Sequence, residues 1–324
     1  MKALVTGAGG FVGGALVRAL LARGDGVRAA VRSRTGQERL AADGVELVAL
    51  DLARADGSAL ADVMAGTDAV FHVAGAYRIG ISRRERAALH AANVETTRRV
   101  LDAALAANVP RIVYTSTANV LGNTHGQAPD ESYRRPQPPR FVSYYDETKY
   151  LAHLLAEERI AAGAPILVAM PGMVYGPGDH SQAGAQIQAA VDGRMRAIAA
   201  GGLGGNLVHV DDVAAGHLLI HDRGQDGRDY LLGGERARMA EVFRRAAAIG
   251  RRTAPRLTIP DWLLRTAGAL GGLATRLSDR LPALDELVSA SVDVTYWFDD
   301  SRARGELGYA PRGLDDGLRT LLPA

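Results

Sequence analysis

The first 170 residues alternate short apolar or β-branched runs with stretches of helical periodicity. The runs predict strands at Ala3–Thr6, Val27–Val31, Val45–Leu50, Ala69–Val73, Ile112–Ser116 and Ile166–Met170. The intervening periodicity predicts helices at Phe11–Arg23, Ser58–Met64, Arg86–Asn108 and Tyr144–Ala162. Strands that are apolar throughout and alternate with helices are typical of a parallel sheet covered on both faces. The sequence therefore predicts an α/β fold with a doubly wound parallel sheet, whose ligands bind beyond the carboxyl ends of the strands.

After Met170 the pattern becomes irregular. A Gly/Pro-rich turn, a short helix and a glycine loop (GGLGGN) precede NLVHVDDVAAGHLLIHD, where Asp211 or Asp212 is expected to cap the next helix. A further strand, DYLLGG, follows, and the chain from Glu235 is mostly helical. We therefore expect two interleaved units. Residues 1–170 and 203–234 would form the larger domain, and residues 171–202 and 235–324 a smaller one.

Composition narrows the function classes. The 324 residues include no cysteine, which excludes disulfides, thiolate nucleophiles and cysteine-based metal sites. A net charge of +2 gives no broad footprint for nucleic acid. The apolar stretch Trp262–Leu273 is interrupted by Arg265 and is too short to span a bilayer. No secretory signal pattern opens the chain, so we expect a cytoplasmic protein with a small-molecule substrate, no nucleic-acid, membrane or metal partner, and a possible homodimer.

Glycines follow the first predicted strand in TGAGGFVGG. Gly7, Gly10 and Gly13 allow a tight strand-to-helix turn and a close approach of backbone N–H groups to a pyrophosphate. In a chain with 38 glycines the spacing alone is a weak signal, and the position between the first strand and the first long helix gives it weight. A tight turn without a ligand is the alternative.

Two later positions bear on the choice of dinucleotide. The second predicted strand is followed by Arg32, and an arginine there accommodates the 2′-phosphate of NADP, whereas an NAD site usually has an acidic residue. Asp51 and Leu52 follow the third strand and are candidates for the adenine pocket. The alternatives are a solvated strand end for Arg32 and a helix N-cap for Asp51.

The strongest chemical signal is Tyr145 followed by Lys149. On a helix these side chains share one face, and an ammonium beside a phenol is expected to lower the tyrosine pKa, making it usable as an acid or base. Chance pairing is rare because the chain has ten tyrosines and only one lysine besides Lys2. Tyr144 is one residue out of this spacing, and a surface pair is the alternative interpretation.

Hydroxyl and amide groups lie at the same predicted sheet edge. The fifth strand ends in Thr115, Ser116 and Thr117, and alternation places Thr115 and Thr117 on one side and Ser116 on the other. Each could polarise a substrate oxygen or be an ordinary strand-end hydroxyl. Asn93 lies within a predicted helix, where asparagine is unfavourable. The loop ESYRRPQPPR, with three arginines, could clamp a diphosphate or be solvated: Arg134, Arg135 and Arg140.

Taken together these segments resemble the extended short-chain dehydrogenase/reductase family. The matching segments span the chain in order: TGAGGFVG, LDL, FHVAGAY, AANVETT, VYTSTANVLG, YDETK, PGMVYGPGD and VHVDDVA. VRAAVR, HVAGAYR, NLVHVDDVAAGHLL and ELGYAPR are similar to the dihydroflavonol-reductase-like branch, including the hopanoid-associated sugar epimerase group. The resemblance implies a Rossmann fold with a smaller interleaved C-terminal domain.

The resemblance also implies roles for individual residues. Tyr145 would be the acid/base, Lys149 would hold the nicotinamide ribose, Asn93 would position the relay, and Thr117 stands where the family has its catalytic serine. Thr96 stands where the family usually has glycine. The implied substrate contacts are Tyr77, Thr117 and Tyr145. The implied cofactor contacts are Gly7, Gly10, Phe11, Val12, Gly13, Arg32, Asp51, Leu52, Val73, Ala74, Tyr145, Lys149, Pro171, Met173 and Val174.

Three functions are consistent with these residues. The first is an NADP-dependent reductase or dehydrogenase acting on a carbonyl or secondary alcohol, which Arg32 favours. The second is a nucleotide-sugar epimerase or dehydratase with tightly held NAD, which uses the same groups for transient oxidation. The third is a non-catalytic dinucleotide sensor, against which the intact Tyr145–Lys149 pair argues.

Overall fold

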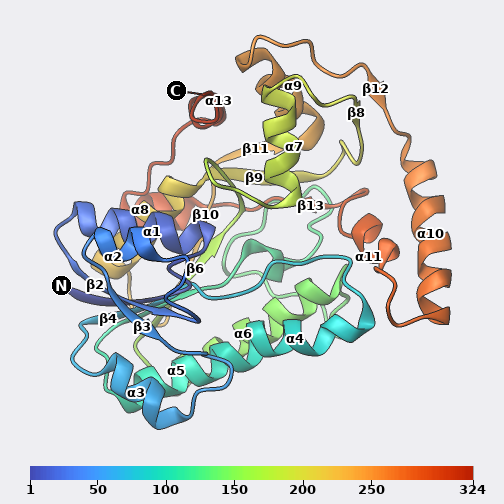
Figure 1. Ribbon diagram of the computed structural model, residues 1–324. Helices are drawn as coiled ribbons and strands as arrows, with labels where there is room; N and C mark the ends of the chain where they lie inside the picture. Colours follow the sequence, from blue (N-terminus) through green and yellow to red (C-terminus); the bar gives the residue numbers. More distant parts are fainter. Residues whose placement is uncertain (324) are drawn as a thin grey trace.

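A computed structural model of the chain describes residues 1–323. Seven strands form one sheet in the order β10-β6-β5-β4-β1-β2-β3, and every neighbouring pair is parallel (Figure 1). These strands are β1 Lys2–Thr6, β2 Gly26–Val31, β3 Glu46–Ala49, β4 Ala69–His72, β5 Ile112–Thr115, β6 Ile166–Pro171 and β10 Asp229–Leu232. The order reverses between β1 and β4, which is where doubly wound sheets bind their ligands. The predicted fold class is confirmed.

Helices cover both faces of this sheet (Figure 1). One face is covered by α1 Phe11–Ala22 and α8 Val210–Arg223, with α12 Ser301–Leu307 beyond α8. The other is covered by α3 Gly57–Met64, α5 Thr96–Ala106 and α6 Tyr144–Ala161. Short helices complete this domain at α2 Glu38–Ala42 and α4 Arg86–His90. The apolar strands lie between two helical layers, and this explains why their sequences do not alternate with polar residues.

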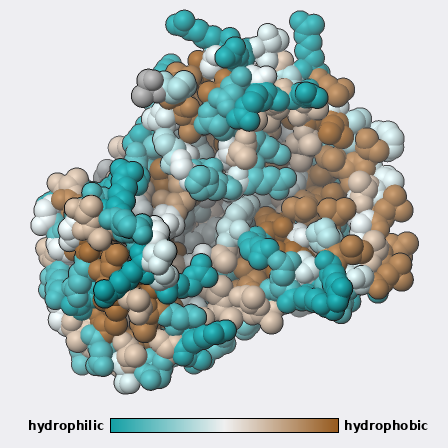
Figure 2. All heavy atoms as spheres, viewed as in Figure 1, coloured by the Kyte–Doolittle hydropathy of each residue, from teal (hydrophilic) through white to brown (hydrophobic). Residues whose placement is uncertain are grey.

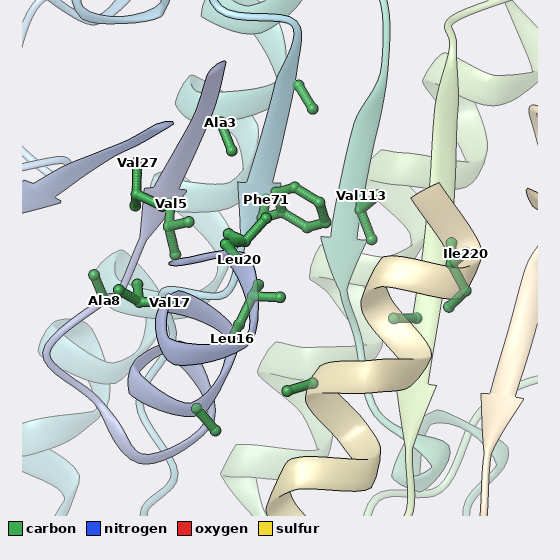
Figure 3. Close-up of a cluster of buried hydrophobic side chains, with 14 of the residues drawn as sticks. Ala3, Val5, Ala8, Leu16, Val17, Leu20, Val27, Phe71, Val113 and Ile220 are labelled. Atoms are coloured by element: carbon green, nitrogen blue, oxygen red, sulfur yellow. The ribbon is translucent and has the colours of Figure 1, made fainter. Parts of the chain in front are cut away.

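Figure 3 shows the core between the sheet and the first helical layer, where Val5 of β1 and Phe71 of β4 lie beside Leu16 and Leu20 of α1, and Ile220 of α8 covers the sheet farther along. All five side chains are fully buried. Burial of each such side chain contributes about 1.5–3 kcal/mol, so this contact fixes α1, and with it the glycine loop, against β1.

A second sheet carries the smaller lobe. It consists of β7 Met173–Tyr175, β9 Gly204–His209, β11 Glu235–Arg238 and β13 Thr295–Tyr296, and β9 pairs with the other three. The remaining elements of this lobe are α7 Gln182–Val191, β8 Ala197–Ile198, α9 Met239–Ile249, β12 Leu257–Thr258, α10 Asp261–Leu277, α11 Leu284–Ser289 and α13 Leu314–Arg319. No helix in residues 1–323 combines the length and apolarity needed to cross a membrane.

Two local expectations from the sequence are wrong. Residues 201–206 are not a loop throughout, because Gly204 and Gly205 belong to β9 and pair with Arg238 and Ala237. Strand β9 therefore joins the smaller sheet, whereas α8 and β10, from the same predicted domain segment, lie with the larger one. The cap of α8 is His209, whose Nδ1 accepts a hydrogen bond from the N–H of Asp211 at 3.2 Å, rather than either aspartate.

Candidate active site and dinucleotide site

Helix α6 places Tyr145 and Lys149 at the carboxyl end of β5. The Ser143 hydroxyl caps the helix by accepting a hydrogen bond from the N–H of Asp146 at 3.2 Å, so Tyr145 lies in the first turn. Tyr145 and Lys149 are both buried, with exposed fractions of 8% and 7%. A buried tyrosine and lysine on one helix face are not a surface pair. Tyr144 instead lies outside this contact, where the Arg86 guanidinium covers its ring at 4.9 Å.

Burial raises the pKa of the Tyr145 phenol above its ordinary value of 10, and the Thr117 hydroxyl opposes this shift. The expectation that Lys149 would lower this pKa is therefore wrong in this structure. The reason lies in where the ammonium is: its Nζ donates a hydrogen bond to the Thr115 carbonyl at 3.1 Å and lies 5.3 Å from the centre of the Tyr114 ring. Tyr145 is consequently a neutral phenol over the ordinary pH range, ready to donate a proton.

Lys149 is itself affected by its surroundings. Burial lowers the pKa of its ammonium to about 8, because a charged group loses its hydration there. At neutral pH the side chain is still mostly protonated, whereas above pH 8 it is mostly neutral. The charge on Lys149 is thus available in a narrower pH range than that of a solvated lysine.

The three strand-end hydroxyls have separate partners. Thr115 Oγ1 lies 2.8 Å from His217 Nε2 on α8, and Ser116 Oγ lies 3.1 Å from His153 Nδ1 on α6. Of the three hydroxyls, that of Thr117, which follows the end of β5, is the one that opposes the rise in the pKa of Tyr145. Ser116 and Thr117 therefore both meet residues of α6, whereas Thr115 meets α8, so the expected alternation holds between Thr115 and Ser116 but does not continue to Thr117. The regular alternation ends with the strand at Thr115.

Asn93 lies in a π-helical turn, Ala91–Glu95, between α4 and α5. Its Oδ1 accepts a hydrogen bond from the Ala76 N–H at 2.7 Å, and its Nδ2 donates to the Ala76 carbonyl and to Thr148 Oγ1 at 3.1 and 3.0 Å. The amide therefore ties the segment after β4 to α6, one residue from Lys149. Thr96 donates to the Ala91 carbonyl at 3.0 Å across the same turn, so its side chain is accommodated within the helix.

The glycine loop forms the cradle that a dinucleotide requires. A Cβ on Gly13 would lie 2.1 Å from the Gly7 carbonyl oxygen, and one on Gly7 would lie 2.8 Å from the Ala74 nitrogen. Gly7 also has a φ of 72°, which L-residues rarely adopt. Helix α1 begins at Phe11 with no side-chain cap and no acidic residue in its first turn, within the described chain. Free N–H groups at a helix start attract an anion, so these residues fit a bound pyrophosphate.

A buried hydrogen-bond chain supports the junction of β1 and β4. His72 lies between Thr6 and Thr97, with ring nitrogens 2.8 and 3.1 Å from their hydroxyl oxygens. Thr6 in turn accepts a hydrogen bond from the Ala74 N–H at 3.1 Å. Burial lowers the pKa of His72 to about 3, so the ring is neutral. This chain of hydrogen bonds could not be predicted from the sequence, because three separated polar residues in apolar runs give no spacing signal.

The nucleotide-selecting positions lie at the ends of β2 and β3. Arg32 and Arg34 are exposed beyond Val31, and neither forms a salt bridge with any described residue. Asp51 accepts a hydrogen bond from the Ala53 N–H at 3.0 Å, in a turn. It is not a helix N-cap, because Asp56 caps α3. Leu52 is buried in the core.

The other predicted contacts lie around the same sheet edge. Phe11 and Val12 open α1, Val73 and Ala74 follow β4, Pro171 ends β6, and Met173 and Val174 lie in β7. Tyr77 is 56% exposed, and its ring meets the Tyr145 ring edge-on at 4.8 Å between centroids. Tyr77 is therefore placed where a substrate could contact both rings.

Arg135, in the arginine loop, neither clamps a diphosphate nor lies in solvent, which were the two expectations for this loop. This side chain is buried, and its Nη2 bonds both carboxylate oxygens of Asp146 at 3.0 and 2.9 Å. Its guanidinium also lies over the rings of Phe141 and Tyr150. Arg135 therefore holds the start of α6 and is neither a solvated residue nor a diphosphate clamp. No spacing pattern indicates this pair, whose members are eleven residues apart.

Comparisons with known proteins agree with this geometry. A model of the NAD dependent epimerase/dehydratase family matches residues 3–233. The chain is 34% identical over 322 residues to a dihydroflavonol 4-reductase-like protein of Synechocystis sp., covering 97% of this chain and 91% of that protein. It is 32% identical over 345 residues to 2-alkyl-3-oxoalkanoate reductase of Stenotrophomonas maltophilia, covering 99% and 98%. The crystal structure of gox2253 matches with a TM-score of 0.82 and 32% identity, covering 99% and 96%.

The pKa of Lys149 gives a testable pH dependence. We expect the affinity for the dinucleotide to fall as pH rises through about 8, because the ammonium loses its charge there. In Lys149→Arg the guanidinium stays charged, so this fall should disappear, but the affinity should be lower at every pH because a broad planar fork cannot replace a compact ammonium. Fluorescence titration of the reduced dinucleotide at several pH values measures both effects. Wild-type affinity and an unchanged pH profile in the arginine variant would contradict the assigned role.

Proposed function

Because the chain belongs to the NAD-dependent epimerase/dehydratase family, we propose that it is an NADP-dependent oxidoreductase that moves hydride between nicotinamide and a carbonyl or secondary alcohol. The observation that carries this proposal is the buried phenol of Tyr145, which lies one helical turn from Lys149 and whose pKa is affected by the Thr117 hydroxyl. The glycine cradle lies at the end of β1, within the same sheet.

Thr117, Tyr145 and Lys149 would each have a separate role in the reduction of a carbonyl. The bound dinucleotide supplies the hydride. Thr117 donates a hydrogen bond to the carbonyl oxygen, and Tyr145 gives that oxygen its proton as the negative charge develops, which leaves a phenolate. Lys149 would hold the ribose, and solvent then returns a proton to Tyr145. The reverse sequence oxidises an alcohol.

The raised pKa of Tyr145 supports carbonyl reduction as the working direction. A phenol that is neutral at ordinary pH can donate a proton at once, whereas alcohol oxidation needs the phenolate first. Reduction therefore starts from the protonation state that burial favours. The relatives named as reductases support the same direction.

The preference for NADP is supported by Arg32 and Arg34. Both are exposed just beyond β2 and without salt-bridge partners in residues 1–323, so their charges are available to a 2′-phosphate. The candidate substrates are the 3-oxoalkanoates and dihydroflavonols for which the two relatives are named. We place a substrate contact at Tyr77, whose ring meets that of Tyr145. We assign substrate binding to the smaller domain, residues 171–202 and 235–324. The enzyme would be cytoplasmic.

A nucleotide-sugar epimerase or dehydratase with tightly held NAD is the second candidate. The family description, which names epimerases and dehydratases, favours it. Such an enzyme uses Tyr145 first as a base and returns the hydride to the same substrate. Mass spectrometry of the nucleotide released from the purified protein separates the two candidates, since retained NAD indicates the epimerase and NADP the reductase.

Replacement of Tyr145 by phenylalanine tests the proposed chemistry. With NADPH deuterated at C4 and a panel of 3-oxoalkanoates and dihydroflavonols, the wild-type enzyme should place deuterium on the new carbinol carbon. Tyr145→Phe should bind the dinucleotide normally but lose about 10²–10⁴-fold in turnover, the usual contribution of general acid catalysis. Tyr144→Phe is the matched control and should keep its turnover. Comparable turnover in both variants would show that Tyr145 is not the proton donor.

Replacement of Arg32 by alanine tests the dinucleotide preference. A charge-assisted hydrogen bond contributes about 1.5–3 kcal/mol, so Arg32→Ala should weaken NADP binding roughly ten- to a hundredfold and leave NAD binding nearly unchanged. Arg256→Ala, which removes an exposed arginine with no salt-bridge partner among the described residues, should affect neither. Calorimetric titration of each variant with both nucleotides gives the comparison. Equal losses for NADP and NAD would show that Arg32 does not read the phosphate.

A further inference from the structure

Helix α10 presents its apolar side chains to solvent. Five of them form what we call the α10 apolar face, with exposed fractions of 46–86%: Trp262, Leu263, Leu270, Leu273 and Leu277. Leu257, Leu281 and Leu284, also exposed, flank the helix along the chain. Residues 1–323 have eleven exposed large apolar side chains, and these eight residues are most of them. Figure 2 shows the hydrophobic surface on the side where Figure 1 places α10.

The side of α10 that meets the protein is made of small residues. A Cβ on Gly268 would lie 2.9 Å from the Val288 side chain, and one on Gly271 would lie 2.6 Å from Leu284, both of α11. At 100° per residue the glycines and Thr275 share one side, and the five large apolar residues share the opposite side. The helix is therefore amphipathic with its apolar side turned outward, contrary to a helix that covers a core.

The charge around this face limits what can cover it. Residues 253–280 contain four arginines and two aspartates, and the neighbouring α11 carries Asp285 and Glu286, of which Glu286 is paired with Arg86 of the larger domain. Arg265 forms a salt bridge with Asp293, but Arg256, Arg276 and Arg280 form none with described residues. Two copies joined through α10 would bring these like charges together, which opposes self-association. An anionic surface complements them.

We propose that α10 adsorbs to an anionic lipid bilayer, with the α10 apolar face in the headgroup region and the nearby arginines at lipid phosphates. Apolar side chains opposite a packed face, a tryptophan and a basic flank are the features of interfacial helices. The finding that no described helix can cross a membrane agrees with adsorption rather than insertion. This proposal replaces the expectation from the sequence that the protein has no membrane partner.

The contact between α11 and the larger domain fixes where such a bilayer would lie. The Ala283 N–H donates to the Gly80 carbonyl at 3.0 Å, and Glu286 accepts hydrogen bonds from Arg86 at 2.5 Å and from the Tyr144 N–H at 3.2 Å. These contacts are next to Tyr145. Helix α10 is therefore attached, through α11, to the side of the molecule that carries the candidate active site.

Vesicle binding by the full-length protein tests the proposal. The protein should co-sediment with vesicles of equal parts phosphatidylcholine and phosphatidylglycerol, and much less with phosphatidylcholine alone. Leu270→Gln/Leu273→Gln should reduce binding about a hundredfold, because burial of each leucine in the bilayer contributes about one factor of ten. The matched control is Leu154→Gln/Leu322→Gln, at sites exposed by 38% and 40% outside the helix, and it should bind as the wild type does.

Two further measurements separate the alternatives. In Trp297→Phe, Trp262 is the remaining tryptophan, and brominated lipid in the anionic vesicles should quench its emission. Arg276→Gln/Arg280→Gln should weaken binding to the anionic vesicles but keep the face intact. No vesicle binding by the wild type, or equal binding by both leucine double variants, would overturn the proposal. So would a dimer in sedimentation velocity that only the α10 leucine variant abolishes, because a second copy would then cover this face.

Discussion

Burial of one face of α6 against the carboxyl end of β5 is the constraint on which the candidate site depends. It places a phenol and an ammonium together in a region that disfavours both of their charged forms, raising the pKa of Tyr145 and lowering that of Lys149. Several buried contacts maintain this arrangement. Arg135 holds Asp146 at the start of the helix, and Asn93 bonds Thr148 beside Lys149. The chemistry thus depends on packing at some distance from the reacting groups.

Much of the larger domain could be predicted from the sequence because its signals are local. The apolar strands are found within a residue or two of their expected ends, and α6 covers 144–161 as its pattern indicates. The four-residue spacing was enough to place Tyr145 and Lys149 on one face. The glycines were enough to predict the tight turn before α1, because only a residue without Cβ fits against Gly7.

Features that arise from long-range packing could not be predicted. The pKa of Tyr145 depends on how deeply the phenol is buried, which the neighbouring lysine does not reveal. Strand β9 pairs with segments up to about 90 residues away, so its glycines suggested a loop rather than a strand. The apolar stretch at α10 was recognised, but its outward orientation depends on the glycine contacts with α11. Each of these features needs the tertiary arrangement.

The central claim is that Tyr145 is held as a neutral phenol, poised to donate a proton. Its direct test is NMR of the protein with ¹³C-labelled tyrosine ring Cζ, with Tyr145→Phe used to assign the signal. We expect the Tyr145 resonance to remain that of the protonated phenol up to pH 10, the ordinary tyrosine pKa. A Tyr145 signal that titrates well below pH 10 would contradict the account.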